Sequence, residues 1–220
     1  MLSAENLASI ESEGRRLGTY IRRDPERPVP QYPEWTMADL ASHTASIHGR
    51  TTQIVTELPA DRISAPRLPD GADVADWYDR TLDAMLAALT GADPERACWG
   101  FGPSPSVGFW ERRMVIETGV HRWDAAQAFG EEDRLIDNVA RSGLDEFGDM
   151  WHPHLGKVPT LRVTATDLGR SWVYGEGEPS TDAEGTASNV YLRLVSRTSP
   201  VDLPEDWAAA VDGLAPPPKR

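Results

Sequence analysis

The chain has 220 residues, of which 40% are hydrophobic, and its formal net charge is −13. This length can bury the core of one large domain or two small ones, whereas the acidic excess argues against binding to nucleic acid or to an anionic membrane surface. No apolar run approaches the roughly 20 residues of a membrane span, and the single cysteine, Cys98, excludes an intrachain disulfide, so we expect a cytoplasmic protein.

The N-terminal part begins with two predicted helices. The first covers residues 3–22, where Ser3 can cap the helix and apolar residues recur at helical spacing. Several prolines then require an extended connection that ends at Trp35. The second helix starts at Thr36, which forms a loose capping box with Asp39.

The third helix has the most regular apolar pattern. Its stripe runs from Val74 to Leu89, and Gly91 is placed to end the helix. The glycine- and proline-rich stretch over residues 98–105 predicts a loop. A fourth helix covers residues 110–130, so this part of the chain contains four amphipathic helices of the length found in bundles.

After residue 130 the pattern changes to a mixture of helices and strands. A fifth helix is expected over residues 136–151. Apolar and polar residues alternate over residues 161–166, and Trp172 and Tyr174 continue the return strand of a hairpin. The other predicted elements are a short strand near residues 182–185 and helices over residues 187–195 and 205–214.

These elements predict an α+β fold in two domains. Residues 1–155 are expected to form a helical bundle, and residues 156–215 a small α/β domain. The proline-rich tail over residues 216–220 is expected to be frayed.

The fourth helix carries two ionisable residues on its most apolar stripe. Glu117 and His121 are four residues apart, so their side chains leave the helix on the same side. Burying a carboxylate and an imidazole among apolar neighbours is costly unless a partner compensates them. A divalent metal ion is one such partner, and a direct hydrogen bond between the two side chains is the simpler alternative.

A metal site here also needs a ligand from a second helix. His43 and His48 lie on opposite edges of the buried face of the second helix, too far apart around it to share one small ion. Only one of them is therefore expected to be a ligand, and spacing alone leaves the choice open. Three protein ligands would leave one coordination position open, as in catalytic zinc sites, although nickel, cobalt or iron would also suit nitrogen and oxygen ligands.

Two stretches carry a resemblance to a known family. Residues 33–43 read PEWTMADLASH, and residues 113–125 read RMVIETGVHRWDA. In this order and at this distance they resemble the P-x-W-[ST]-x-x-[DE]-L-x-x-H and R-x-x-x-E-x-x-x-H-x-x-D-A motifs of the mycothiol-dependent maleylpyruvate isomerase family. The C-terminal segments LRVTATDLGRSWVY and GTASNVYLRLVSR are similar to the second domain of that family.

The resemblance implies a DinB-like metal-binding four-helix bundle and a particular chemistry. Carried over by position, the zinc ligands of the family fall on His43, Glu117 and His121, which selects His43 over His48. In the family, the metal binds the low-molecular-weight thiol mycothiol and stabilises its reactive thiolate. The thiolate then attacks an electrophilic small molecule, either to isomerise a double bond or to transfer the thiol.

The resemblance also points to an arginine in the second domain. Arg197 matches a functional arginine of the family isomerase, and it would bind an anionic substrate. The alternative is that Arg197 only caps the end of a helix. Ser196 stands where the family usually has glycine, and this departure concerns the segment that would bind the anionic substrate, not the metal site.

Two other residues flank the predicted ligands. Asp124 follows His121 by three residues, and it would either order the imidazole from outside the ligand set or be a surface acid. Arg113 lies one turn before Glu117 and is expected to be its ion-pair partner.

We therefore expect an enzyme that uses a divalent metal and mycothiol, as an S-transferase or a cis–trans isomerase. Its partners would be a thiol and a small electrophile, without nucleic acid or membrane, and it would be a monomer or a homodimer. One alternative is a non-catalytic binding or stress protein, whose metal site would be closed by a fourth side chain such as His48. Another is a thiol-dependent hydrolase in which metal-bound hydroxide is the nucleophile.

Overall fold

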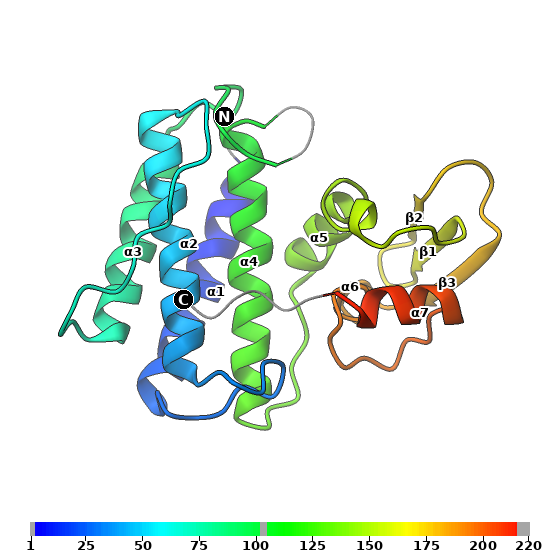
Figure 1. Ribbon diagram of the computed structural model, residues 1–220, viewed down its shortest axis with the longest axis horizontal. Helices are drawn as coiled ribbons and strands as arrows, with labels where there is room; N and C mark the ends of the chain where they lie inside the picture. Colours follow the sequence, from blue (N-terminus) through cyan, green and yellow to red (C-terminus); the bar gives the residue numbers. More distant parts are fainter. Residues whose placement is uncertain (1–2, 102–104, 215–220) are drawn as a thin grey trace. The chain divides into compact units, whose positions relative to one another are not determined.

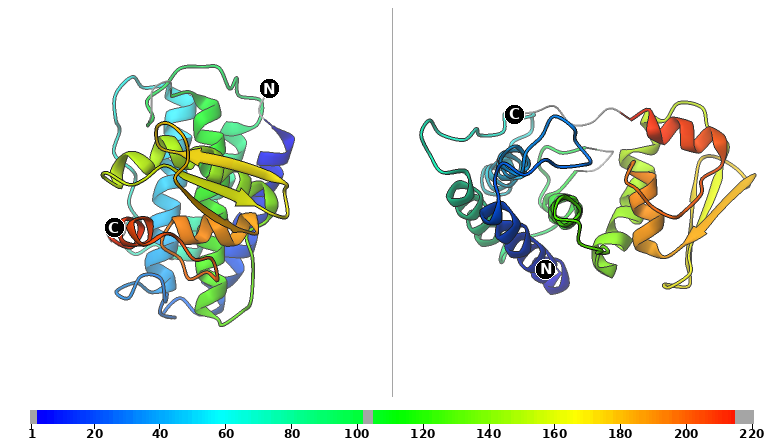
Figure 2. Two further views of the ribbon diagram at one scale, coloured as in Figure 1. Left: turned by 90° about the vertical axis from the view of Figure 1, so that its right-hand side faces the viewer. Right: turned by 90° about the horizontal axis from the view of Figure 1, so that it is seen from below.

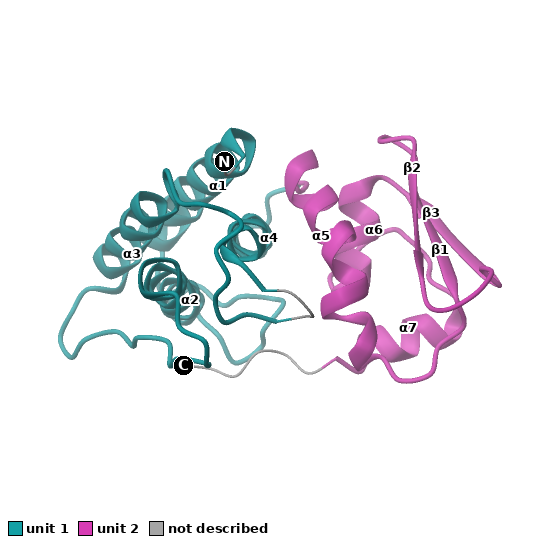
Figure 3. Ribbon diagram, turned by 90° about the horizontal axis from the view of Figure 1, so that it is seen from above, with its two compact units in different colours: residues 1–133, 218–220 teal, residues 134–217 magenta. Residues whose placement is uncertain are grey.

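The computed structural model describes residues 3–101 and 105–214, so the tail expected to be frayed, residues 216–220, lies outside the described residues. The chain forms two compact units, of which the first ends at Asp133 and the second begins at Arg134 (Figure 3). Across the described ranges there are seven α-helices and one three-stranded sheet, which confirms the α+β class. No helix in this part of the chain combines the length and the apolar character needed to cross a bilayer.

Unit 1 is built from four long helices (Figure 1). They are α1 (Ala4–Arg23), α2 (Met37–Glu57), α3 (Val74–Leu89) and α4 (Val107–Ala128). Helix α2 packs mainly on α3, and α1 packs mainly on α4; the right-hand view of Figure 2 shows α2 and α4 nearly end-on. All four predicted helices are therefore present, and they form the expected bundle.

The start of α4 differs from the prediction. The helix begins at Val107, whereas its expected first residue is Trp110. Ser106 is extended and its hydroxyl accepts a hydrogen bond from the backbone N–H of Phe109, which caps the first turn. The capping serine therefore marks the beginning of this helix, and the added turn is also buried at Val107 and Phe109.

The capping box predicted for α2 is present in full. The Thr36 hydroxyl accepts a hydrogen bond from the Asp39 backbone N–H at 3.3 Å, and the Asp39 carboxylate accepts one from the Thr36 N–H at 2.9 Å. This cap fixes the direction in which the helix begins. His43 lies two turns further along, so the cap also fixes where its imidazole meets α4.

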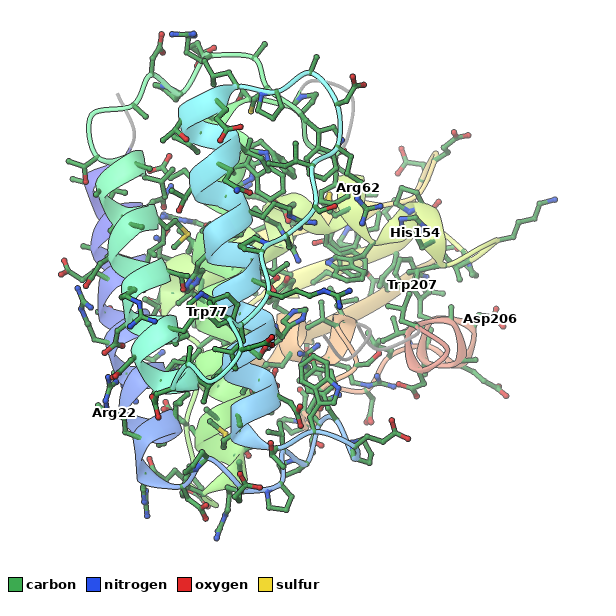
Figure 4. The ribbon with its side chains drawn as sticks, turned by 60° about the vertical axis from the view of Figure 1, so that its left-hand side comes forward. Arg22, Arg62, Trp77, His154, Asp206 and Trp207 are labelled. Carbon is green, nitrogen blue, oxygen red and sulfur yellow. The ribbon has the colours of Figure 1, made fainter. Side chains whose placement is uncertain are left out.

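A buried ion pair joins α1 to α4. The side chain of Arg122 is fully buried, and its Nε donates to Oε2 of Glu13 at 2.6 Å. Its Nη1 also donates to Asp133, the last residue of unit 1. At the surface, Arg22, labelled in Figure 4, pairs with Asp79 and so connects α1 to α3.

Unit 2 contains the remaining elements. They are α5 (Asp137–Met150), the 3₁₀ turn η1 (His152–His154), β1 (Leu161–Ala165), β2 (Arg170–Tyr174), β3 (Thr181–Gly185), α6 (Ala187–Leu194) and α7 (Glu205–Asp212). The expected hairpin is formed by β1 and β2, which pair antiparallel, while β3 pairs parallel to β1, so the strand order is β2-β1-β3. Helices α5 and α6 lie on one side of this sheet (Figure 3).

Helix α5 explains why the unit boundary differs from the one expected near residue 155. It packs on α6 and on β2, so it belongs to the second unit and not to the bundle. The fully buried Phe147 of α5 contacts the rings of Tyr174 and Trp207. Trp207, labelled in Figure 4, is also fully buried, and its indole N–H donates to the Pro159 carbonyl at 2.7 Å.

Candidate metal centre

The bundle brings three potential metal ligands to one point between α2 and α4. They are His43 on α2, and Glu117 and His121 on α4, and one ligand atom from each lies within 4.8 Å of the others. Within the described residues, no other group of three or more histidine, cysteine or acidic side chains has this arrangement. The structure therefore selects His43 for this cluster, as the resemblance implies.

Both imidazoles face the same carboxylate oxygen. Nε2 of His43 lies 3.1 Å from Oε1 of Glu117, and Nε2 of His121 lies 3.2 Å from that atom. The two rings meet edge to face, with their centroids 5.2 Å apart. All three residues are less than a tenth exposed, so the cluster lies inside unit 1.

The electrostatics of the cluster suit a positive charge. Burial raises the pKa of Glu117, but the hydrogen bonds from both imidazoles and the nearby Arg113 outweigh it and hold that pKa well below its usual value. Burial lowers the pKa of His121, but its contacts with Asp124 and Glu117 outweigh that effect and raise the pKa to about 9. The Glu117 carboxylate is therefore ionised and attracts a cation. A bound metal ion would replace the proton that the raised pKa places on His121.

Asp124 holds the outer nitrogen of His121. Its Oδ2 lies 3.0 Å from Nδ1 of the imidazole, and its side chain is fully buried, which excludes the surface-acid alternative. A carboxylate at Nδ1 leaves Nε2 directed at the cluster. Histidines that bind metals usually have such a partner on the other ring nitrogen.

Arg113 pairs with Glu117, as expected from the spacing of these residues. Its Nη2 donates to Oε2 of the carboxylate at 3.0 Å. This contact uses the oxygen that does not face the imidazoles. Glu117 therefore has a different partner on each oxygen.

His48 is not part of the cluster. Its Nε2 is 3.0 Å from Oγ1 of Thr118, and its ring packs against that of Tyr78. Burial lowers the pKa of His48 to about 3, so the imidazole is neutral at physiological pH. The fourth ligand named for a closed, non-catalytic site is thus engaged elsewhere.

Two aromatic residues line the cluster, and no role was predicted for them from the sequence. The ring of Trp35 packs against His43 with centroids 5.1 Å apart, and the ring of Tyr32 lies 6.1 Å from that of His121. Both side chains are buried, and both come from the connection between α1 and α2. This connection, expected to be extended, turns back on itself, so that Pro28 forms a bridge with Thr36 and the Val29 N–H donates to the Trp35 carbonyl. Trp35 could have been found because it belongs to the first family motif, whereas Tyr32 lies outside that motif.

Arg197 lies in unit 2, where it follows the end of α6. Its backbone N–H donates to the Leu192 carbonyl at 2.8 Å, and the Ser196 N–H donates to the Arg193 carbonyl at 3.2 Å, which is a Schellman motif. The Arg197 guanidinium also donates to the Val195 carbonyl at 2.8 Å. These contacts are those of a capping residue, and a substrate-binding role for Arg197 remains a proposal.

The residues of the cluster fit a divalent cation. Two imidazole nitrogens and one carboxylate oxygen form the donor set found in catalytic zinc sites with three protein ligands. The buried carboxylate on the second nitrogen of His121 also agrees with such a site.

Comparisons with known proteins point to one family. The model of the mycothiol maleylpyruvate isomerase N-terminal domain matches residues 7–126, which include the whole cluster. The fold resembles the crystal structure of the mycothiol-dependent maleylpyruvate isomerase, with a TM-score of 0.67, 11% identity, and coverage of 91% of this chain and 94% of the other. A histidine-to-alanine mutant of that isomerase matches with a TM-score of 0.71, and the same identity and coverage. Among curated proteins, none matches this chain.

Proposed function

The chain belongs to the mycothiol maleylpyruvate isomerase N-terminal domain family, and on this premise we propose that it is a metal-dependent enzyme that uses mycothiol to transform a small electrophile. The reaction would be an isomerisation of a double bond or a transfer of the thiol. The observation that carries the proposal is the convergence of His43, Glu117 and His121 within the region that the family model matches.

The three residues would hold the cation from two helices, and we favour zinc because of the donor set. When bound, such a cation stabilises the thiolate form of a thiol and so supplies the nucleophile. His121 would contribute its Nε2 because Asp124 holds Nδ1. The proton that leaves the thiol would be released to water, because the imidazoles and Arg113 hold the pKa of Glu117 well below its usual value and make this carboxylate a poor proton acceptor.

The identity of the second substrate is limited by chemistry. It must offer an electrophilic carbon to a thiolate, and in an isomerisation this carbon belongs to a conjugated double bond. For an anionic substrate we propose Arg197 as the binding cation, because it matches the functional arginine of the family isomerase and is not fully buried. We place the reaction in the cytoplasm, where a thiol stays reduced, and propose a monomer or homodimer acting on small molecules alone.

The experiment that tests this function is a thiol-consumption screen. Purified, metal-loaded protein is incubated with mycothiol and a panel of small electrophiles, with glutathione as the comparison thiol. We expect consumption or isomerisation with mycothiol and at least one electrophile, and loss of this activity in Glu117→Gln. Metal-loaded protein that is inactive with both thiols across the panel would instead support the non-catalytic binding protein.

A further inference from the structure

The two oxygens of Glu117 have different neighbours. Oε1 lies 3.1 Å and 3.2 Å from the Nε2 atoms of His43 and His121. Oε2 lies 3.0 Å from Nη2 of Arg113. One side of the carboxylate thus faces the two imidazoles, and the other faces a guanidinium.

The position of Arg113 favours a stable contact with Oε2 of Glu117. It lies one helical turn before Glu117 on α4, the spacing at which side chains meet on a helix. Its side chain is 14% exposed and that of Glu117 is 10% exposed, so little water competes for the contact. Hydrogen bonds between charged partners are stronger than neutral ones, and the planar guanidinium restricts their direction more than an ammonium would.

A carboxylate can bind a metal ion through one oxygen or through both. When both oxygens bind, the carboxylate takes a coordination position that a substrate would otherwise use. In this chain, Oε1 faces the imidazole nitrogens, while Oε2 is held by Arg113. The contacts therefore favour binding through Oε1 alone.

We propose that Arg113 is a positioning residue that limits Glu117 to one metal-facing oxygen and thereby keeps a coordination position open for the thiol. This inference rests on the proposed function, since it requires a cation at the cluster. The spacing of Arg113 and Glu117 predicts only an ion pair, and the inference adds a role for that pair in how Glu117 would bind the cation. Without the guanidinium, Oε2 would lose its charged partner in a place where Glu117 is only 10% exposed, and a bound cation could then take Oε2 as a second ligand.

The test replaces the native metal with cobalt in the full-length protein, because cobalt absorption reports the number of ligands. The variants are Arg113→Met, which removes the charge and the donors, and Arg113→Lys, which keeps the charge on a flexible stem. Arg112→Met is the matched control, because it removes the neighbouring charge from α4 and leaves the Arg113–Glu117 pair in place. Each protein is titrated with 2-mercaptoethanol, and the sulfur-to-cobalt charge-transfer band gives the thiol affinity.

We expect Arg113→Met to bind cobalt, to show the weaker visible absorption of a higher coordination number, and to lose at least about tenfold in thiol affinity. Arg113→Lys should lie between this variant and the wild type, and it carries the test if Arg113→Met does not fold. Arg112→Met should match the wild type. Wild-type spectra and thiol affinity in both Arg113 variants would overturn the inference, and so would loss of cobalt from Arg113→Met alone. Failure of wild-type protein to bind cobalt would instead overturn the proposed function.

Discussion

Nδ1 of His121 lies 3.0 Å from the fully buried carboxylate of Asp124, and this contact fixes the nitrogen with which the imidazole faces Glu117. It also holds the plane of the ring, so the cluster does not depend on a metal for its shape. Such outer contacts commonly change metal affinity by about 10- to 100-fold when they are removed.

Asp124→Asn should therefore weaken metal binding by about 10- to 100-fold without abolishing it. The amide removes the negative charge and allows the imidazole to adopt the other tautomer. Competition with a chromophoric chelator measures the affinity. Asp83→Asn, which alters an exposed contact with Arg15 on the other side of unit 1, is the control and should keep the wild-type affinity. Equal affinities in the two variants would show that Asp124 does not support the site.

His48 provides a test that separates the open site from a closed one. Its imidazole contacts Thr118 and not the cluster, so His48→Gln should retain one metal ion per chain. Metal analysis after dialysis against metal-free buffer measures this. A variant that loses its metal would assign His48 to the ligand set and favour a structural role for the ion.

The same residue predicts how stability changes with pH. The pKa of His48 is lowered from 6.5 to about 3 by burial, so below pH 6.5 the unfolded chain binds a proton that the folded chain does not. Acid therefore favours unfolding through this group. Between pH 7.5 and 5.5 the wild type should lose about 1 kcal/mol more stability than His48→Gln. Urea unfolding at the two pH values measures the difference, and parallel losses in both proteins would refute a buried, neutral His48.

Ser196 occupies a position that favours glycine. Its φ is 61°, in the left-handed region, and its hydroxyl donates to the Val211 carbonyl. Ser196→Gly removes the strain of a side chain but also the hydrogen bond, so its stability should stay within about 1 kcal/mol of the wild type. Ser196→Val should cost about 2 kcal/mol more, since a branched side chain is poorly tolerated there. Urea midpoints compare the two, and equal midpoints would show that the Schellman turn does not hold this conformation in solution.

The buried pair of Arg122 and Glu13 predicts a strong coupling. Arg122→Met alone should destabilise the protein by about 3 kcal/mol or more. The variant leaves the buried Glu13 carboxylate with the more distant and partly exposed Arg16 as its ion-pair partner. The double variant with Glu13→Leu should recover much of that loss. Arg15→Ala, at an exposed pair, should cost less than about 1 kcal/mol. Additive losses in the double variant would show that the two residues act independently.

Much of the bundle could be predicted from local patterns in the sequence. The apolar stripe of α3, the cap at Thr36 and the four-residue spacing of Glu117 and His121 all act within a few turns of one helix. Local spacing could not choose between His43 and His48, because the choice depends on which side of α2 faces α4. The resemblance to the family implies His43, and His43 is the histidine of α2 that lies beside Glu117 and His121.

Other features depend on contacts that no local pattern records. Arg122 and Glu13 are far apart in the sequence, and each looks like an ordinary surface residue of a helix until α1 packs on α4. The parallel pairing of β3 with β1 likewise requires the chain to cross over before it returns to the sheet. The division of the chain at residue 133 also depends on packing, because α5 (Asp137–Met150) joins unit 2 through its contacts with α6 and β2.

The most direct test of the central claim is to measure the cobalt content and the thiol response of the wild type beside His43→Ala. We predict one cobalt ion per wild-type chain and a sulfur-to-cobalt charge-transfer band when mycothiol is added. His43→Ala should lose both, because it removes the only ligand that α2 contributes to the cluster of described residues. A His43→Ala protein that keeps its cobalt and gives the same band would contradict the assignment of this site.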